Sequence, residues 1–166
     1  MIQPAPGGAE AGLPEAGRRT LAVTRSAMRF CLARAWSPLA EVPLPDGRRA
    51  DILALRPDGG FVIIEVKSCA RDFLSDAKWQ AYRAFADELH FAVDLDFPQA
   101  LLPGDVGLLV CDGFEASALR EAPAHPLAPA RRRALLHRFA TLAANRLAGL
   151  ADPAGLVERR AALRLE

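Results

Sequence analysis

The stretch "RADILALRPDGGFVIIEVKS", residues 49–68, decides the fold, because it joins two apolar runs through a Pro-Asp-Gly-Gly turn. Such runs on either side of a turn predict a β-hairpin, with strands over 48–56 and 60–67. Three charged residues interrupt the pattern: Asp51 in the first run, and Glu65 and Lys67 in the second. The segment "FVIIEV" is nearly continuous hydrophobe, which is typical of a central strand buried on both faces. A charge in such a strand needs a partner or a metal ion.

The spacing of these charges predicts a site. Glu65 and Lys67 are two apart, so they share one face of the strand, and Asp51 approaches Glu65 from the neighbouring strand. Two carboxylates with the backbone carbonyl of Val66 are oxygen ligands that suit Mg²⁺ or Mn²⁺. Lys67 beside such a metal can orient a water or offset charge on a phosphate. The alternative is that the three charges form the solvated face of a hairpin, as surface ion pairs commonly do.

The rest of the chain predicts an α/β domain. The chain is expected to begin with a helix over 20–36 and a weak strand over 39–44, which Pro43 confines to an edge. The hairpin comes next. After the hairpin we expect a helix over 69–88 and short strands over 89–95 and 106–112. These are followed by a weak strand within 114–121, a linker over 122–130 and a helix over 130–150. The first helix is expected to bury a stripe made of Leu21, Thr24, Met28, Cys31, Leu32 and Ala35. This order indicates a mixed central sheet flanked by helices. We expect residues 1–17 to be a flexible tail and 18–166 a single domain, with a C-terminal helical extension from about 129.

Composition sets the class of protein. The chain has 166 residues, 51% of them hydrophobic and 25% charged, as in soluble globular proteins. No apolar stretch reaches the roughly 20 residues that span a bilayer. The first residues lack a secretory signal, and three separated cysteines favour a reducing cytoplasm, where each is expected to be a small buried hydrophobe. The net charge of +1 does not argue for or against nucleic acid.

The segment Asp51…Glu65-Val66-Lys67 resembles the D…ExK signature of the PD-(D/E)xK nuclease superfamily, with Ala50 in place of the proline. That resemblance implies a restriction-endonuclease-like core, α-β-β-β-α-β. The chain is more closely similar to the MmcB-like family of bacterial DNA-repair endonucleases. The similarity runs over about residues 20–148, in "GRRADILAL", "FVIIEVKS", "DFLSDAKWQAYRAFAD", "FAVDLDFP", "GLLVCD" and "ARRRALLHRFATLAANRL". It implies a cytoplasmic, metal-dependent DNA nuclease of DNA repair, associated with the nucleoid when it is bound to DNA.

Further residues are candidates for metal or DNA contacts. Glu41 is a candidate third carboxylate, and its alternative is a structural glutamate. Lys78 and Tyr82 lie four apart on the predicted second helix, so they share one side of it. Lys78 is a candidate contact to a phosphate and Tyr82 to a base or sugar; the alternative is a solvated lysine above a half-buried tyrosine. Ser68 either bonds a phosphate or caps the following turn. The arginine clusters add Arg49, Arg131, Arg132 and Arg133, whose alternative is salt bridges within the protein. Asp72, Asp76 and Gln80 are expected on a solvated face, and Trp79 is either packed by a loop or exposed.

The residues therefore predict a metal-dependent deoxyribonuclease in which Asp51 and Glu65 bind Mg²⁺ or Mn²⁺ and Lys67 positions the attacking water. The expected partner is DNA, in a damaged or branched form, with repair proteins or a second copy of the chain as further partners. The rival hypothesis is a non-catalytic DNA-binding or scaffold module that keeps the same fold. RNA is a third candidate substrate, because nothing in the sequence reads a 2′-hydroxyl.

Overall fold

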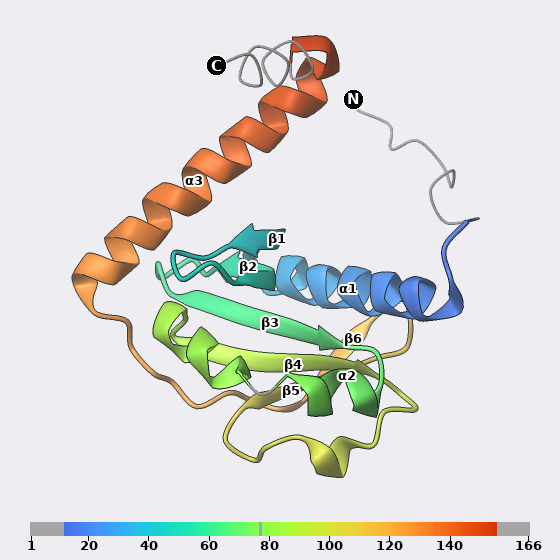
Figure 1. The fold of residues 1–166 in the computed structure, drawn as a ribbon. Coiled ribbons are helices and arrows are strands. Elements are labelled where there is room, and N and C mark those ends of the chain that lie inside the picture. Colours follow the sequence, from blue (N-terminus) through green and yellow to red (C-terminus); the bar gives the residue numbers. More distant parts are fainter. Residues whose placement is uncertain (1–11, 77, 156–166) are drawn as a thin grey trace. The chain divides into compact units, whose positions relative to one another are not determined.

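The computed structural model describes residues 12–76 and 78–155, in two compact units, Met1–Leu127 and Ala128–Glu166. Within these residues no helix has both the length and the apolar character needed to cross a bilayer. The elements of the first unit are α1 (Glu15–Ala33), β1 (Ser37–Pro43), β2 (Arg49–Leu55), β3 (Phe61–Lys67), α2 (Ala70–Ser75), η1 (Trp79–Phe85), β4 (Glu88–Asp94), η2 (Gln99–Leu101), β5 (Gly107–Cys111) and β6 (Ala116–Arg120) (Figure 1).

The sheet of the first unit is mixed, as the sequence predicts. Its six strands follow the order β1-β2-β3-β4-β5-β6 (Figure 1). β1, β2 and β3 are antiparallel neighbours, β3, β4 and β5 run parallel, and β6 returns antiparallel to β5. The hairpin is therefore confirmed, and β1 lies at an edge, where a strand that ends in Pro43 is tolerated. Glu41 in β1 has a left-handed backbone (φ 50°), between the Ala40–Ile52 and Val42–Ala50 pairs of the ladder.

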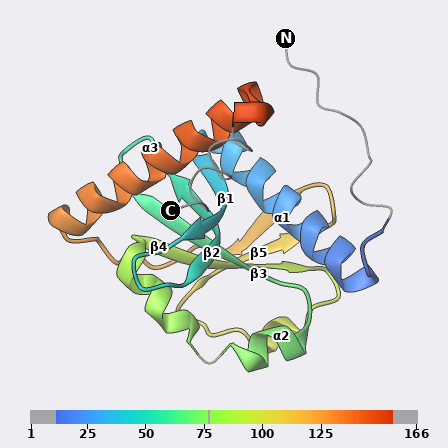
Figure 2. The same ribbon diagram turned by 45° about the horizontal axis from the view of Figure 1, so that its top comes forward.

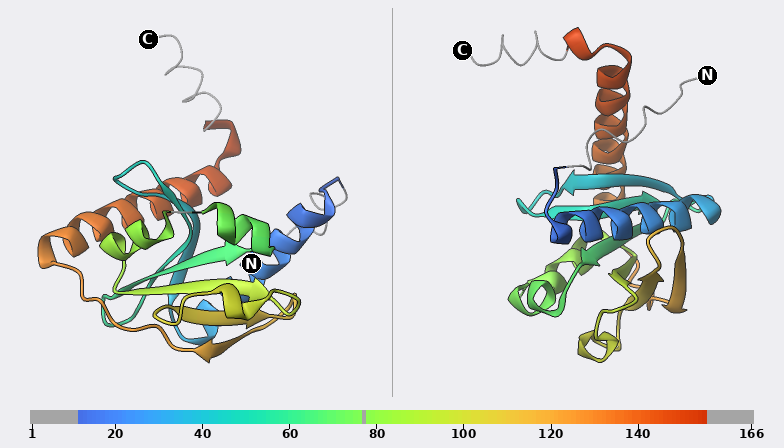
Figure 3. Two further views of the ribbon diagram at one scale, coloured as in Figure 1. Left: turned by 60° about the horizontal axis from the view of Figure 1, so that its bottom comes forward. Right: turned by 90° about the vertical axis from the view of Figure 1, so that its right-hand side faces the viewer.

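The central strand β3 is buried along its whole length, as its continuous apolar run predicts. Side chains alternate between the two faces of a strand, so Val62, Ile64 and Val66 point to one layer and Ile63, Glu65 and Lys67 to the other. The first set packs with residues of α1. The second set faces α2 and η1, which lie on the opposite side of the sheet from α1 (Figure 2) and are seen from two further directions in Figure 3. Both charged residues of β3 thus point into the α2–η1 layer.

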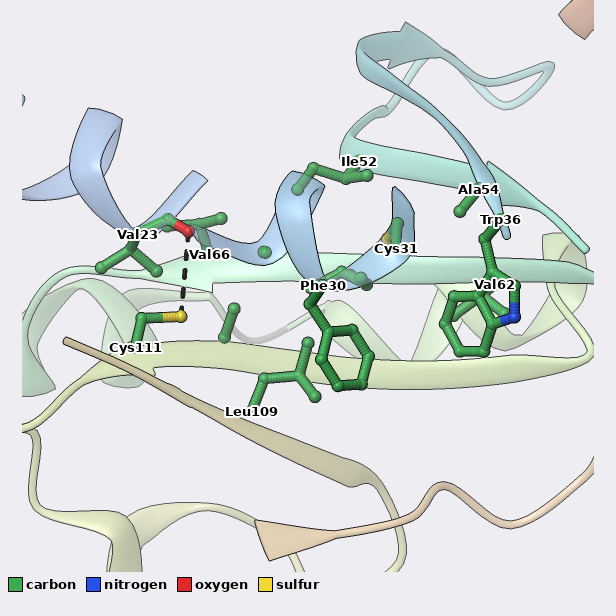
Figure 4. Packing of buried hydrophobic residues seen from close by; sticks show 13 residues of the cluster. Val23, Phe30, Cys31, Trp36, Ile52, Ala54, Val62, Val66, Leu109 and Cys111 are labelled. Atoms are coloured by element: carbon green, nitrogen blue, oxygen red, sulfur yellow. Dashed lines mark hydrogen bonds between the residues drawn. The ribbon is translucent and has the colours of Figure 1, made fainter. Parts of the chain in front are cut away.

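Helix α1 buries a stripe that matches the predicted one in part, because Cys31 is buried and Met28 packs against the core, whereas Ala35 lies beyond the end of the helix. Its buried residues are Val23, Ser26, Ala27, Phe30 and Cys31, whereas Leu32 is 63% exposed. The small Ser26 and Ala27 have no side-chain surface exposed, and we infer that their size lets the helix approach the sheet closely. Together with β-strand residues such as Ile52, Val62 and Leu109, the helix forms the main core (Figure 4).

The bounds of α1 also differ from the predicted range of 20–36. The helix begins at Glu15, so residues 15–17 of the expected tail are helical, and residues 1–11 lie outside the described ones. It ends at Ala33 because the N–H groups of Ala35 and Trp36 turn back to the carbonyls of Leu32 and Cys31, 3.0 and 2.9 Å away. Ala35 adopts φ 57°, the left-handed conformation of this terminating motif.

The predicted helix over 69–88 is wrong in its continuity. The structure has the short helix α2, a break at Asp76, and the 3₁₀ helix η1. Phe73 and Trp79 both make edge-to-face contacts with Phe91 of β4, at centroid distances of 5.4 and 5.6 Å. A continuous α-helix would place residues six apart on different faces, so the break allows both rings to pack on one strand. Trp79 is accordingly buried, and Cys69, expected to be buried, is exposed at the start of α2.

The second unit consists mainly of α3 (Pro129–Ala151), which agrees closely with the predicted helix over 130–150. A proline lies in the first turn of this helix, where a backbone N–H has no partner within the helix, so its lack of an N–H costs nothing there. Residues 121–128 carry no regular secondary structure, as expected of a linker, and the backbone is again helical over 153–155. The rest of the expected C-terminal extension, residues 156–166, lies outside the described part of the chain.

His90 in β4 is an ionisable residue with a fully buried side chain. Its side chain has no exposed surface, and within residues 12–76 and 78–155 neither ring nitrogen is hydrogen-bonded. The imidazole lies against Gly107 of β5, and any side chain at Gly107 would collide with it. Burial, with a smaller contribution from Arg34, lowers the pKa of His90 to about 4, although Glu121 opposes this. The ring is therefore neutral at pH 7.

This low pKa predicts a loss of stability in mild acid. Because the unfolded chain binds a proton near pH 6.5 and the folded chain only near pH 4, stability is complete above pH 6.5 and falls as the pH drops toward 4. The loss attributable to His90 approaches roughly 3 kcal/mol. The loss is measured as the change, between pH 7.5 and pH 4, in the difference between the free energies of urea unfolding of the wild type and of His90→Leu. A difference between the two proteins that does not change with pH would contradict the assignment.

Candidate metal centre

The candidate centre lies where β2 and β3 separate. The antiparallel ladder between these strands ends at the Ile52–Ile64 pair, and β3 continues for three residues that pair with β4. Side chains replace the ladder beyond that point. The backbone N–H of Asp51 donates to Glu65 Oε1 at 3.2 Å, and the backbone N–H of Val66 donates to Asp51 Oδ2 at 2.8 Å. Each carboxylate thus braces the strand that carries the other, which brings Asp51 and Glu65 together as the sequence predicted.

This bracing occupies one oxygen of each carboxylate. Among the described residues no backbone N–H donates to the second oxygens, Asp51 Oδ1 and Glu65 Oε2. The N–H and carbonyl of one residue point to the same edge of an extended strand. Since the Val66 N–H points toward Asp51, its carbonyl lies on the β2 side of β3 as well. The site can therefore offer carboxylate oxygens of Asp51 and Glu65 and the Val66 carbonyl oxygen, with the Tyr82 hydroxyl beside Glu65.

The two carboxylates are buried side by side, and each raises the cost of ionising the other. Glu65 is 3% exposed, and its burial together with the charge of Asp51 raises its pKa to about 8. Burial also raises the pKa of Asp51, although the Val66 N–H and Lys67 oppose this. Two buried carboxylates that cannot both ionise near pH 7 retain a proton, which a cation can displace. The donor set is made only of hard oxygen atoms and fits Mg²⁺ or Mn²⁺.

Lys67 is buried and paired with an acid that the sequence analysis assigned to a solvated face. Its Nζ atom lies 2.8 Å from Asp76 Oδ2. Burial alone would lower the pKa of Lys67, but the hydrogen bond and charge of Asp76 outweigh it and raise the pKa above its ordinary value. Asp72 is a second carboxylate near Lys67, and its Oδ2 accepts a hydrogen bond from the Ser68 N–H at 3.4 Å. The expectation of a solvated face is wrong for Asp76, because the helix breaks there. The only feature of the sequence that pointed to this ion pair is that a lysine in a buried strand needs a carboxylate partner.

Glu41 does not join the pair. Its side chain is 66% exposed and lies 3.5 Å from the Arg49 guanidinium, which is 60% exposed. Within the described ranges, no three histidine, cysteine, aspartate or glutamate residues are grouped so that they could hold a metal ion. The structure therefore gives no support to Glu41 as a third carboxylate, whereas Arg49 lies two residues from Asp51 with an accessible side chain.

Lys78 and Tyr82 do not share a face, because Lys78 only precedes η1, and in a 3₁₀ helix residues four apart point in directions about 120° apart. Lys78 is exposed, whereas Tyr82 is 8% exposed and donates its hydroxyl to the Arg49 carbonyl at 3.1 Å. Burial and the charges of Glu65 and Asp51 raise the pKa of Tyr82. Its ring is therefore part of the wall of the site and is not presented to a base.

The remaining DNA-contact candidates lie in two different parts of the chain. Ser68 is half-buried, and its backbone N–H contacts Asp72 at the turn into α2. Arg131, Arg132 and Arg133 lie in the first turns of α3, in the second unit. Their role in DNA binding stays a prediction.

The surroundings of Lys67 predict a difference in reactivity between the only two lysines of the chain. At pH 8 we expect acylation of Lys67 to be roughly tenfold or more slower than that of exposed Lys78, because its amine is paired and enclosed. Peptide mass spectrometry after brief treatment with an acetylating reagent measures both rates in one sample. Equal rates would show that the Lys67–Asp76 pair does not form.

Comparison with known proteins places the chain in a family. The family described as "DNA repair protein MmcB-like" matches residues 10–154. A solved protein of unknown function from Silicibacter pomeroyi is similar in structure, with a TM-score of 0.79 and 41% sequence identity over 87% of this chain and 96% of that one. A comparison with curated proteins returned no match. Because the family match spans most of the sequence, the chain belongs to the MmcB-like family of DNA repair proteins.

Proposed function

We propose that the chain is a metal-dependent nuclease of the PD-(D/E)xK type that hydrolyses phosphodiester bonds of DNA during repair. The observation that carries this proposal is the mutual bracing of Asp51 and Glu65 across the separating strands, with Lys67 two residues further on the same face. The order α1-β1-β2-β3-α2-β4 agrees with the α-β-β-β-α-β core of that superfamily. The family's description as DNA repair proteins favours DNA as the substrate.

In the proposed reaction Asp51, Glu65 and the Val66 carbonyl would hold the divalent cation. When bound, the cation supplies positive charge that polarises the phosphate and lowers the pKa of water. Lys67 acts as an ammonium donor, because its raised pKa keeps it protonated at neutral pH. It binds a non-bridging oxygen of the scissile phosphate or orients the attacking water, and does not accept a proton from it. The buried ring of Tyr82 supports the strand that carries Asp51.

Two accessible cations near this centre are suited to hold the DNA backbone. Arg49 lies on β2 beside Asp51, and Lys78 follows the break that contains Asp76. Contacts of this kind to phosphates fix the position of the nucleic acid without reading its sequence. We propose that both residues contribute to affinity and that neither contributes directly to the chemical step.

The two lysines provide the experiment. We expect the wild type to cleave at least one of branched, nicked, single-stranded or duplex DNA with Mg²⁺ or Mn²⁺, and Lys67→Ala to lose roughly 100-fold or more in turnover. Lys78→Ala, the matched control, removes the same charge from an exposed position. It should weaken binding by a few-fold and reduce the salt dependence of binding by roughly one phosphate contact.

Binding and cleavage are measured on the same substrates, by fluorescence anisotropy and by gel assay. Glu65→Gln should abolish cleavage while DNA binding persists. If the wild type binds DNA but cuts no substrate with either metal, the non-catalytic module is the correct function. Cleavage of RNA in preference to every DNA substrate would overturn the choice of DNA.

A further inference from the structure

The Lys67 ammonium has more than one carboxylate within its surroundings but pairs with Asp76. β3 places it on the same face as Glu65, two residues away, beside two buried carboxylates. Its Nζ atom nevertheless lies within ion-pair distance of Asp76 and not of Asp51 or Glu65. The ammonium therefore pairs with Asp76 and makes no ion pair with Asp51 or Glu65, although both carboxylates lie near enough for their charges to act on it.

This pairing has an energetic cause. The Lys67 side chain is 7% exposed, so its ammonium must find a carboxylate inside the protein. Asp76, at the C-terminal end of α2 and 24% exposed, supplies one at 2.8 Å. Without Asp76, the flexible four-carbon stem of the lysine would let the ammonium turn to Glu65 or Asp51. There it would neutralise the oxygens that are otherwise left for a cation.

We propose that Asp76 is a positioning residue that holds the Lys67 ammonium off Asp51 and Glu65, so that their second oxygens stay open to a divalent cation. The inference rests on the proposed metal-binding function and adds to it a residue outside the Asp-Glu-Lys motif. The end of the helix turns this side chain toward the sheet, where it meets Lys67.

The test is a double-mutant cycle read out by Mn²⁺ affinity, measured by electron paramagnetic resonance of free Mn²⁺ without DNA. In Asp76→Asn we expect the affinity to fall roughly tenfold, because the ammonium now competes for the same oxygens. In a Lys67→Met background the competitor is absent, so adding Asp76→Asn should change the affinity by no more than roughly twofold. Asp72→Asn is the matched control, since it removes a neighbouring charge of α2 that does not contact Lys67, and should cost roughly twofold or less.

Circular dichroism and thermal melting show whether each variant is folded, and Asp76→Ser replaces Asp76→Asn if the latter does not melt cooperatively. Asp76→Glu, which keeps the carboxylate, should retain most of the wild-type affinity. An equal loss in the Lys67 and Lys67→Met backgrounds, or no loss in either, would overturn the positioning role while leaving the proposed nuclease intact. If the wild type binds no Mn²⁺ and cuts no DNA, the proposed function itself fails, and the inference fails with it.

Discussion

The candidate site depends on one constraint: a strand buried on both faces has to carry a glutamate and a lysine at its end. Glu65 obtains a hydrogen-bond partner because the two strands of the hairpin separate beside it. Where the β2–β3 ladder stops, Asp51 and Glu65 take the backbone N–H groups that the ladder no longer uses, so the same side chains that form the centre also keep the two strands together. Buried charges of this kind persist only when the surrounding structure provides partners. The layer of α2 and η1 provides the partner for the lysine.

Much of this arrangement follows from the sequence because it depends on local patterns. The turn at 57–60, the apolar run of β3 and the two-residue spacing of Glu65 and Lys67 predict the hairpin, the central strand and the shared face without any tertiary information. Pro43 likewise places β1 at an edge. These features depend on backbone geometry, which a few neighbouring residues determine.

The features that the sequence did not predict depend on contacts between distant segments. The buried stripe of α1 includes Ser26, which hydrophobicity alone would not select. The helix after β3 breaks so that Phe73 and Trp79 can both reach Phe91, and this break moves Asp76 from the predicted solvated face to Lys67. Periodicity assumes an unbroken helix, and here tertiary packing of aromatic rings overrides it.

The form of β1 also has a consequence for how copies of the chain meet. An edge strand is a template on which another chain can add a strand, and continuous addition leads to aggregates. β1 carries prolines at positions 38 and 43, which have no N–H to offer, and the left-handed backbone of Glu41 interrupts the strand between them. Since the N–H groups of a strand alternate between its two edges and these prolines are five residues apart, one of them removes a donor from the outer edge. Together with the turn of the backbone at Glu41, this makes the β1 side a poor template for growth from molecule to molecule, at the edge next to the strand that carries Asp51.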